Sequence, residues 1–261
     1  MSSILNVENI SKSFGGLKAV SNLSFNVKEG EVLAIIGPNG AGKTTVFNLI
    51  TGFYPVDEGK IVFSDIDITS KPPHVISRQG IARTFQNLRL FKNLTVLENV
   101  VAGFYSKNSY SLIDALFATP KRNKLAKSAE EVSFEILEFF KLVSKADNVA
   151  GALPYGEQRK LELARAIATN AKLILIDEPA AGMNPTEVAD FVDLLNAARE
   201  KYGLTFVLIE HQMELVMNIS ERIVVMDFGE KIMEGTPKEV KNDRRVIEAY
   251  LGSDVNLGYR L

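Results

Sequence analysis

Residues 37–44 read Gly-Pro-Asn-Gly-Ala-Gly-Lys-Thr, the pattern G-x-x-x-x-G-K-T of a phosphate-binding loop. The loop follows residues 32–36, a continuous apolar run typical of a strand buried on both faces. Residues 45–50 then place apolar side chains at helical spacing. A helix that begins at such a loop points its free N–H groups and its positive dipole end at phosphates. The sequence therefore predicts nucleotide phosphate binding at this loop.

Glycines in the loop allow the backbone to wrap closely around phosphates without Cβ clashes. Lys43 is expected to reach the β- and γ-phosphates, and the Thr44 hydroxyl is expected to be a Mg²⁺ ligand. The expected cofactor-binding residues of the loop are Gly37, Pro38, Asn39, Gly40, Ala41, Gly42, Lys43, Thr44 and Thr45.

Beyond the loop, strand-like runs alternate with helical ones. Short apolar runs occupy residues 173–176, 205–209 and 222–226. Residues 185–202 have the pattern of a helix, which Gly203 ends. Alternation of this kind predicts an α/β core, here a P-loop NTPase core with a mostly parallel sheet.

Two further regions differ from this core in their pattern of apolar and turn residues. Near the N-terminus, strand-like runs at residues 5–10 and 19–27 and a hairpin at 59–63 are separated by turn dipeptides, which predicts an antiparallel β subdomain. Helical spacing dominates the middle, clearly at residues 96–100 and 128–142.

The helical middle, residues 91–167, is expected to be a subdomain inserted into one domain that spans residues 1–261. The remaining parts, 1–90 and 168–261, would then form the nucleotide-binding core. No internal repeat is visible, so one nucleotide-binding unit is expected.

Bulk composition excludes several classes of protein. The chain has 261 residues, a net charge of −2 and no cysteine, so neither a disulfide framework nor a field that attracts nucleic acid is present. Residues 1–8 lack the features of a signal peptide, and no run approaches the roughly 18 apolar residues of a membrane span. We expect a soluble, cytoplasmic protein.

Two adjacent carboxylates, Asp177 and Glu178, close the buried strand at 173–176. At the carboxyl edge of the sheet, beside the loop, Asp177 is expected to hold Mg²⁺ through water. Glu178 is then placed to polarise the attacking water as a general base.

Residues 153–159, Leu-Pro-Tyr-Gly-Glu-Gln-Arg, lead into an amphipathic helix and resemble the L-S-G-G-Q signature of the ATP-binding cassette family. Other marks of the family fall in order along essentially the whole chain. Phe14 matches the aromatic residue that stacks on adenine, and Gln86 matches the glutamine that senses Mg²⁺ and water. Residues 182–185 match the D-loop, and His211 matches the switch histidine near the γ-phosphate.

This resemblance implies ATP and Mg²⁺ as cofactors, and ATP hydrolysis coupled to transmembrane transport as the activity. The catalytic residues it implies are Glu178, His211, Gln86 and Lys43, and the metal ligands are Thr44, Gln86 and Asp177. The signature residues that would act on the ATP of a partner cassette are Pro154, Tyr155, Gly156 and Glu157.

A narrower resemblance rests on residues 50–54, 83–91, 180–185 and 209–213, and on the length of 103–127. These look like one of the two ATPase subunits of branched-chain amino acid importers. The resemblance implies two membrane permeases, a second ATPase (or a homodimer in isolation) and an extracytoplasmic binding protein as partners, with no nucleic acid. It also implies a place on the inner face of the cell membrane, reached through the permease.

Two positions depart from the general family pattern. Pro154 replaces the signature serine, and Asn184 replaces the aspartate of the D-loop. Proline offers neither a hydroxyl nor an N–H to a γ-phosphate, whereas asparagine keeps its hydrogen-bonding capacity and loses charge. Either these are tolerated variants or one ATP site is weakened, and both readings stay open.

The segment 106–127 carries five basic residues around a small apolar group. It is either a contact surface for the permease or membrane, or a solvated basic face with a local apolar anchor. Its basic residues are Lys107, Lys121, Arg122, Lys124 and Lys127, and its apolar ones are Leu112, Ile113, Ala115, Leu116 and Phe117.

The sequence can also be compared with the requirements of other nucleotide-binding functions. A soluble cassette acting on ribosomes or DNA usually carries two cassettes or a long coiled coil, which this chain lacks. A GTPase switch needs N-K-x-D, and the Asn-Lys pair at 123–124 is followed by Leu-Ala. Within transport, the alternatives are the ATPase of an envelope lipid or lipopolysaccharide exporter, which the tail at 250–254 and 259–261 resembles, and that of a urea or short-amide importer.

Overall fold

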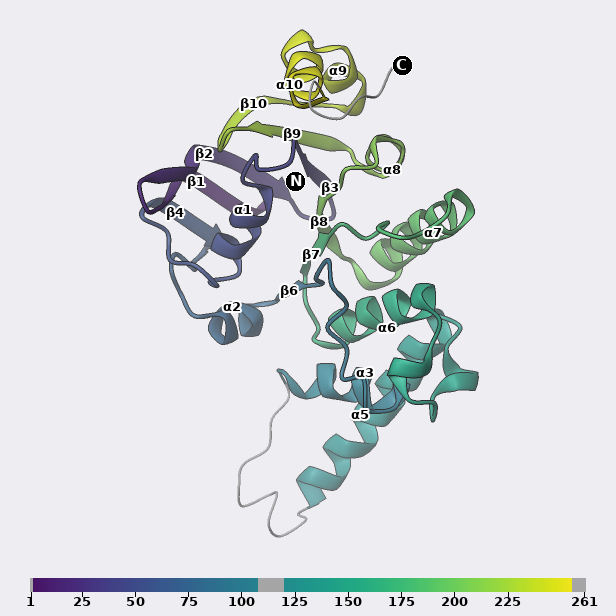
Figure 1. The fold of residues 1–261 in the computed structure, drawn as a ribbon. Helices are drawn as coiled ribbons and strands as arrows, with labels where there is room; N and C mark the ends of the chain where they lie inside the picture. Colours follow the sequence, from purple (N-terminus) through teal and green to yellow (C-terminus); the bar gives the residue numbers. More distant parts are fainter. Residues whose placement is uncertain (1, 108–119, 255–261) are drawn as a thin grey trace.

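The computed structural model describes residues 2–107 and 120–254, which form two β-sheets and a set of helices around them (Figure 1). The apolar residues 112–117 and the tail at 259–261 therefore lie outside the described residues. In the part of the chain that the structure covers, no helix is both long and apolar enough to cross a membrane.

The smaller sheet is antiparallel and confirms the predicted N-terminal β subdomain. Its strands, in the spatial order β2-β1-β4-β5, are β1 (Ser3–Phe14), β2 (Leu17–Lys28), β4 (Glu58–Phe63) and β5 (Ile66–Asp67). The first two strands are longer than the predicted runs because their hairpin continues to a turn at Gly15 and Gly16. Its outer residues are exposed, so the apolar pattern does not reveal them.

The larger sheet has the spatial order β10-β9-β3-β8-β7-β6. Its strands are β3 (Val32–Ile36), β6 (Ile81–Arg83), β7 (Leu173–Asp177), β8 (Thr205–Ile209), β9 (Arg222–Asp227) and β10 (Glu230–Gly235). Every neighbouring pair is parallel except the hairpin of β9 and β10. The prediction of a mostly parallel sheet is confirmed, and the carboxyl ends of β6, β7, β8 and β3 share one edge.

Helices flank this sheet (Figure 1). They are α1 (Lys43–Ile50), α2 (Pro73–Gln79), α7 (Pro185–Tyr202), α8 (Met213–Ile219), α9 (Pro237–Asn242) and α10 (Arg244–Asp254). The bounds of α7 are those predicted, since Asn184 caps its first turn and Gly203 (φ +63°) ends it.

The middle of the chain is helical, as predicted. It contains α3 (Val96–Tyr105), α5 (Pro120–Phe139) and α6 (Tyr155–Ala168), with short 3₁₀ turns at Val143–Lys145 and Ala150–Ala152. The predicted bounds 128–142 for the second helix are wrong. The helix runs from Pro120 to Phe139. Its start was not predicted because its first turns are rich in basic, solvated residues and so show no apolar period. Its end comes before Lys141, whose φ is +57°.

Side chains on the two faces of the large sheet enter different cores. In β8, Phe206 and Leu208 pack in the cluster that includes α3, α5, α6 and α7, while Val207 and Ile209 pack with α1 and the antiparallel sheet. This alternation follows from the two-residue period of a strand. The helical middle therefore shares its core with one face of the sheet rather than enclosing a separate one.

Candidate nucleotide site

The phosphate-binding loop leaves β3 at the carboxyl edge of the large sheet and leads into α1. Gly37 and Gly42 have φ values of +151° and +96°. A Cβ on Gly37 would lie 2.0 Å from the carbonyl oxygen of Met226, and one on Gly42 would lie 2.3 Å from that of Ala19. Only glycine fits these two positions, so the pattern in the sequence is a requirement of the packed loop.

Lys43 occupies the start of α1 with its ammonium folded over the loop. Its Nζ donates to the carbonyl oxygens of Gly37 at 2.7 Å and Pro38 at 2.8 Å. Burial lowers the pKa of Lys43, while the negative charges of Glu178 and Asp177 raise it. The lysine is thus a desolvated cation next to two carboxylates, a position from which it can pair with phosphate.

A cleft of about 470 Å³ lies over the loop. Two of the predicted catalytic side chains, Glu178 and His211, line it together with the loop, which places them around one volume of ligand size. The lining residues are Leu17, Lys18, Ala19, Asn39, Gly40, Ala41, Gly42, Lys43, Thr44, Thr45, Glu178, His211 and Phe228.

Glu178 is the centre of a cluster at the rim of this cleft. Its Oε2 accepts a hydrogen bond from Nε2 of Gln86 at 2.6 Å, and its Oε1 lies 2.7 Å from Nε2 of His211. The three residues follow β6, β7 and β8, whose carboxyl ends are adjacent in the sheet. The backbone of Glu178 has φ +46°, a left-handed conformation that costs a non-glycine residue about 1–2 kcal/mol. Strain of this kind is typical of residues held in position for chemistry.

Asp177 is the buried last residue of β7, and its carboxylate is engaged by an arginine. Its Oδ2 accepts a hydrogen bond from Nη2 of Arg83 at 2.9 Å. Burial raises the pKa of Asp177, and the bond to Arg83 lowers it. Asp177 does not line the cleft itself, although its charge acts on Lys43.

The donor atoms near the loop suit Mg²⁺. Thr44 is exposed in the cleft, and it offers a hydroxyl where Gln86 offers an amide oxygen and Asp177 a carboxylate. Such oxygen donors are the ligands that Mg²⁺ prefers. Residues 2–107 and 120–254 contain no group of three or more His, Cys, Asp or Glu side chains that could hold a metal unaided. A few protein oxygens with phosphates and water are therefore the arrangement that these residues fit.

Phe14, the predicted adenine-stacking residue, lies at the end of β1 and outside the residues that line the cleft. Its ring packs edge-to-face on Tyr54 with centroids 5.1 Å apart, and Nζ of Lys12 lies 5.5 Å from its centroid. The ring remains 42% exposed. Tyr54 and Lys12 therefore contact a ring that is still partly accessible to solvent, and the stacking role stays a prediction.

The four signature residues begin α6, far from the loop of the same chain (Figure 1). Pro154 is the N-cap and makes no side-chain cap hydrogen bond. The Tyr155 hydroxyl accepts from Nη2 of Arg159 at 2.7 Å, and Glu157 pairs with Lys145. A Cβ on Gly156 would meet nothing within 4 Å. Among the described residues nothing next to this position requires glycine, so the space beside it is open.

Asn184, the second departure from the family pattern, caps the start of α7. Its side chain accepts from the backbone N–H of Glu187 at 3.0 Å, while Glu187 accepts from the backbone N–H of Asn184 at 2.8 Å. This reciprocal capping box needs an oxygen acceptor and no charge at position 184. Asparagine therefore performs the same capping as aspartate.

Comparison with known proteins now decides the family. The sequence profile of the family described as ABC transporter matches residues 20–181. This chain belongs to the ABC transporter family. A second profile, for the branched-chain amino acid ATP-binding cassette transporter, matches residues 230–256 of this ABC ATPase.

Curated relatives match the ABC ATPase over nearly its full length. The high-affinity branched-chain amino acid transport ATP-binding protein BraF of Pseudomonas aeruginosa is 43% identical over 95% of this chain and 98% of its own. The high-affinity branched-chain amino acid transport ATP-binding protein LivG of Escherichia coli is 41% identical over 95% of this chain and 98% of its own. A probable LivG of Archaeoglobus fulgidus is 41% identical over 96% of each chain.

Solved ABC cassettes have the same fold. The cassette MJ1267 in its ADP conformation superimposes with a TM-score of 0.83, at 39% identity over 97% of this chain and 100% of that one. The dimeric cassette MJ0796 superimposes with a TM-score of 0.75, at 26% identity over 89% of this chain and 98% of that one.

Sequence reasoning missed three features of the site. Arg83 and its bond to Asp177 were not anticipated, because the two residues are 94 positions apart. Arg159 of α6 is buried and donates to the carbonyl oxygens of Phe85 and Gln86, which holds the glutamine segment from the signature helix. Phe228 lines the cleft while 87% exposed, and an apolar residue beside Gly229 in a turn is the signal that could have revealed it.

Proposed function

We propose that this ABC ATPase is the motor subunit of an importer of branched-chain amino acids. The observation that carries the proposal is 41–43% identity, over 95% of the chain, to BraF and LivG. The match of residues 230–256 to the branched-chain profile supports the same substrate class, and it covers β10, α9 and α10, far along the chain from the loop.

The site geometry supports a division of labour in hydrolysis. The N–H groups of the loop and Lys43 would hold the ATP phosphates, and Phe14 would stack on adenine. Glu178 would draw the proton from the attacking water, and His211, 2.7 Å from it, would stabilise the γ-phosphate. Thr44, Gln86 and, through water, Asp177 would hold Mg²⁺, which would supply charge neutralisation for the phosphates.

The partners in this proposal begin with a second cassette. The signature residues reach no atom of their own loop's cleft, and Gly156 faces open space. They would therefore act on the ATP held by another ATPase subunit, as two cassettes close on their nucleotides. The dimeric form of the similar cassette MJ0796 supports this arrangement.

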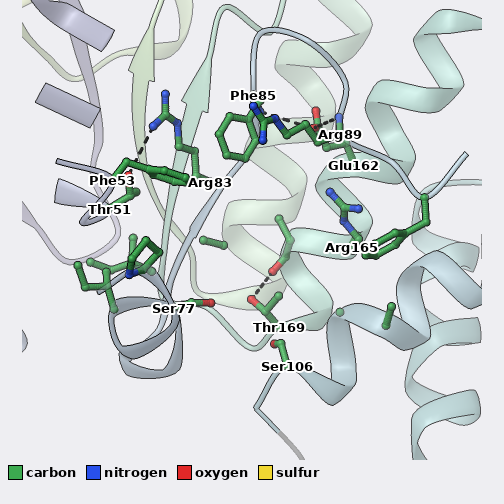
Figure 2. Close-up of a pocket in the computed structure, with 18 residues that line it drawn as sticks. Thr51, Phe53, Ser77, Arg83, Phe85, Arg89, Ser106, Glu162, Arg165 and Thr169 are labelled. Carbon is green, nitrogen blue, oxygen red and sulfur yellow. Dashed lines mark hydrogen bonds between the residues drawn. The ribbon is translucent and has the colours of Figure 1, made fainter. Parts of the chain in front are cut away.

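A groove of about 380 Å³ offers a docking site for the permease. It lies between α2 and β6 on one side and α3 and α6 on the other, and Figure 2 shows Phe53, Phe85 and Arg165 around it. Its floor combines aromatic faces with guanidinium groups, such as Arg89, which lies 4.4 Å from the Phe85 centroid. A permease helix seated here would place the ATPase on the inner face of the membrane.

Replacing Leu88 and Phe91 by aspartate tests this docking surface. Phe91 lines the groove, is 52% exposed and lies under the guanidinium of Arg165 at 5.3 Å, whereas Leu88 is half-buried nearby. One carboxylate in the groove and a second beside it should abolish co-purification with the permease and leave ATP affinity intact. The matched control is Val143→Asp, at another exposed apolar position outside the groove. Survival of the complex in the double variant would place the docking surface elsewhere.

The substrate is tested in the assembled transporter. The chain is purified from detergent-solubilised membranes, the bound partners are identified, and the complex is reconstituted in liposomes with its extracytoplasmic binding protein. The proposal expects leucine, isoleucine or valine to stimulate ATP hydrolysis and to accumulate inside. Stimulation by urea, a short amide or a lipid instead would overturn the substrate class and leave the cassette assignment standing.

A further inference from the structure

Arg83 lies between the nucleotide site and the docking groove and belongs wholly to neither. It is the last residue of β6, and its side chain is only 6% exposed. Nη2 donates to Oδ2 of Asp177 at 2.9 Å, while Nη1 donates to Oδ1 of Asn48 at 2.7 Å. Asn48 belongs to α1, the helix that begins with Lys43, so one guanidinium connects the elements that carry two of the three predicted Mg²⁺ donors, Thr44 and Asp177.

The guanidinium is also held from the groove side. It lies 4.8 Å from the ring centroid of Phe85 and 5.4 Å from that of Phe47. Arg83 and Phe85 both line the groove, whereas Phe47 is fully buried in the core. Figure 2 shows Arg83 extending away from the groove with Phe85 beside it. A body that enters the groove and moves the Phe85 ring therefore displaces the support of the Arg83 guanidinium.

Charge and burial make this arrangement specific. The Asp177 side chain is 5% exposed, so its carboxylate has little water to orient it and depends on protein donors. The planar guanidinium holds its donors in a fixed fork, with Nη2 on Asp177 and Nη1 on Asn48 and, at 3.5 Å, on Oγ1 of Thr51, which a lysine ammonium cannot do. Hydrogen-bond donors behind a metal-binding carboxylate orient it toward the metal, and their loss typically lowers metal affinity about 10–100-fold.

We propose that Arg83 is a positioning residue that orients Asp177 for Mg²⁺ and connects that carboxylate, through Phe85, to the docking groove. The metal-positioning half concerns this chain alone. The connection to the groove rests on the proposed function only in naming a permease as the occupant.

The metal half is tested with the isolated full chain, Mn²⁺ and a non-hydrolysable ATP analogue, by electron paramagnetic resonance of free Mn²⁺. Arg83→Met should raise the Mn²⁺ dissociation constant about 10–100-fold and leave metal-free analogue binding unchanged. Arg83→Lys keeps a cation beside Asp177 and should recover part of the loss. If Arg83→Met does not fold, the Mn²⁺ dissociation constant of Arg83→Lys is used for the comparison with wild type. Wild-type Mn²⁺ affinity in either variant, or tighter binding, would overturn the positioning role.

The groove half is tested by Phe85→Leu in the same assay. Removing one aromatic face from a guanidinium that is only 6% exposed predicts an affinity for Mn²⁺ weakened by about two- to thirty-fold. In an Arg83→Met background the same change should add nothing, since its effect passes through the guanidinium. The matched control is Phe139→Leu. This change removes a ring of α5 whose centroid lies 5.3 Å from Nζ of Lys201 in α7. An undiminished effect of Phe85→Leu in the Arg83→Met background would overturn the connection. Because no permease is present, these outcomes are independent of whether the transporter assignment holds.

Discussion

The loop half of the site and the signature half are built in opposite ways. Around the loop, functional groups contact one another: Lys43 is folded over its own loop, and Glu178 contacts both Gln86 and His211. At the start of α6 the side chains are tied back into the helical subdomain, Tyr155 to Arg159 and Glu157 to Lys145. No signature residue lines the nucleotide cleft.

The glycines make the same contrast. Gly42 is enclosed so tightly that a Cβ would overlap a carbonyl oxygen at 2.3 Å, whereas Gly156 has open space around it. Gly42 is required by the fold of this chain, whereas the described residues give no such reason for Gly156. Under the proposed function, the loop half would be complete within one chain and the signature half would act only in an assembly.

The largest effect is expected from Glu178→Gln in the loop half. Loss of a general base typically lowers turnover about 10²–10⁴-fold, while ATP binding does not depend on it. Both are measured in the assembled transporter, as hydrolysis and as equilibrium binding of labelled ATP. Unchanged turnover would rule out Glu178 as the base.

A similar loss of turnover is expected from Gly156→Glu, but the two variants should differ in the cause of that loss. A carboxylate at the open position would repel the phosphates of the opposing nucleotide, and loss of such phosphate contacts typically costs about 10²-fold in turnover. The isolated variant should keep wild-type ATP affinity and stability, because a Cβ added at Gly156 would meet no atom within 4 Å in the part of the chain that the structure describes. Weakened ATP binding in the isolated chain would contradict the division into two halves.

The paired variants Gly42→Ala and Gly156→Ala sharpen the comparison through stability. Gly42→Ala combines a left-handed backbone with a clash against Ala19, and we expect it to lower the free energy of unfolding by about 2–4 kcal/mol. Gly156→Ala, in the first turn of α6, should raise it by up to about 1 kcal/mol. Urea unfolding of the two isolated variants measures both, and equal effects would refute the contrast.

The smallest expected effect is that of Pro154→Ser. The serine would cap α6, which now lacks a side-chain cap, and should stabilise the isolated chain by about 0.5–2 kcal/mol. It would also add a hydroxyl for the partner's γ-phosphate, worth about 1.5–3 kcal/mol in a charge-assisted bond, or roughly tenfold or more in turnover at that site.

Turnover at the two sites is separated by combining Pro154→Ser with a base mutation in one cassette at a time. An increase confined to the partner's site supports a weakened signature. Increased stability without increased turnover would show that Pro154 is a neutral variant.

Much of the fold could be predicted because its signals are local. The bounds of α7 followed from its helical pattern and a terminal glycine, and the strands β7 and β8 from continuous apolar runs. The start of α5 could not be predicted, since solvated basic turns have no apolar period. The strand β6 has three residues, too few for any period to show.

The sequence by itself determined the phosphate-binding loop and the two carboxylates at the end of β7, because strand, loop and helix are consecutive and the glycines at 37 and 42 have a steric reason. Only the tertiary structure decided which distant groups meet. Gln86 and Glu178 are 92 positions apart, and Arg83 and Asp177 are 94 apart. Their contacts exist because β6 and β7 are neighbours in a parallel sheet, and the order of strands in a sheet is set by packing across the whole chain.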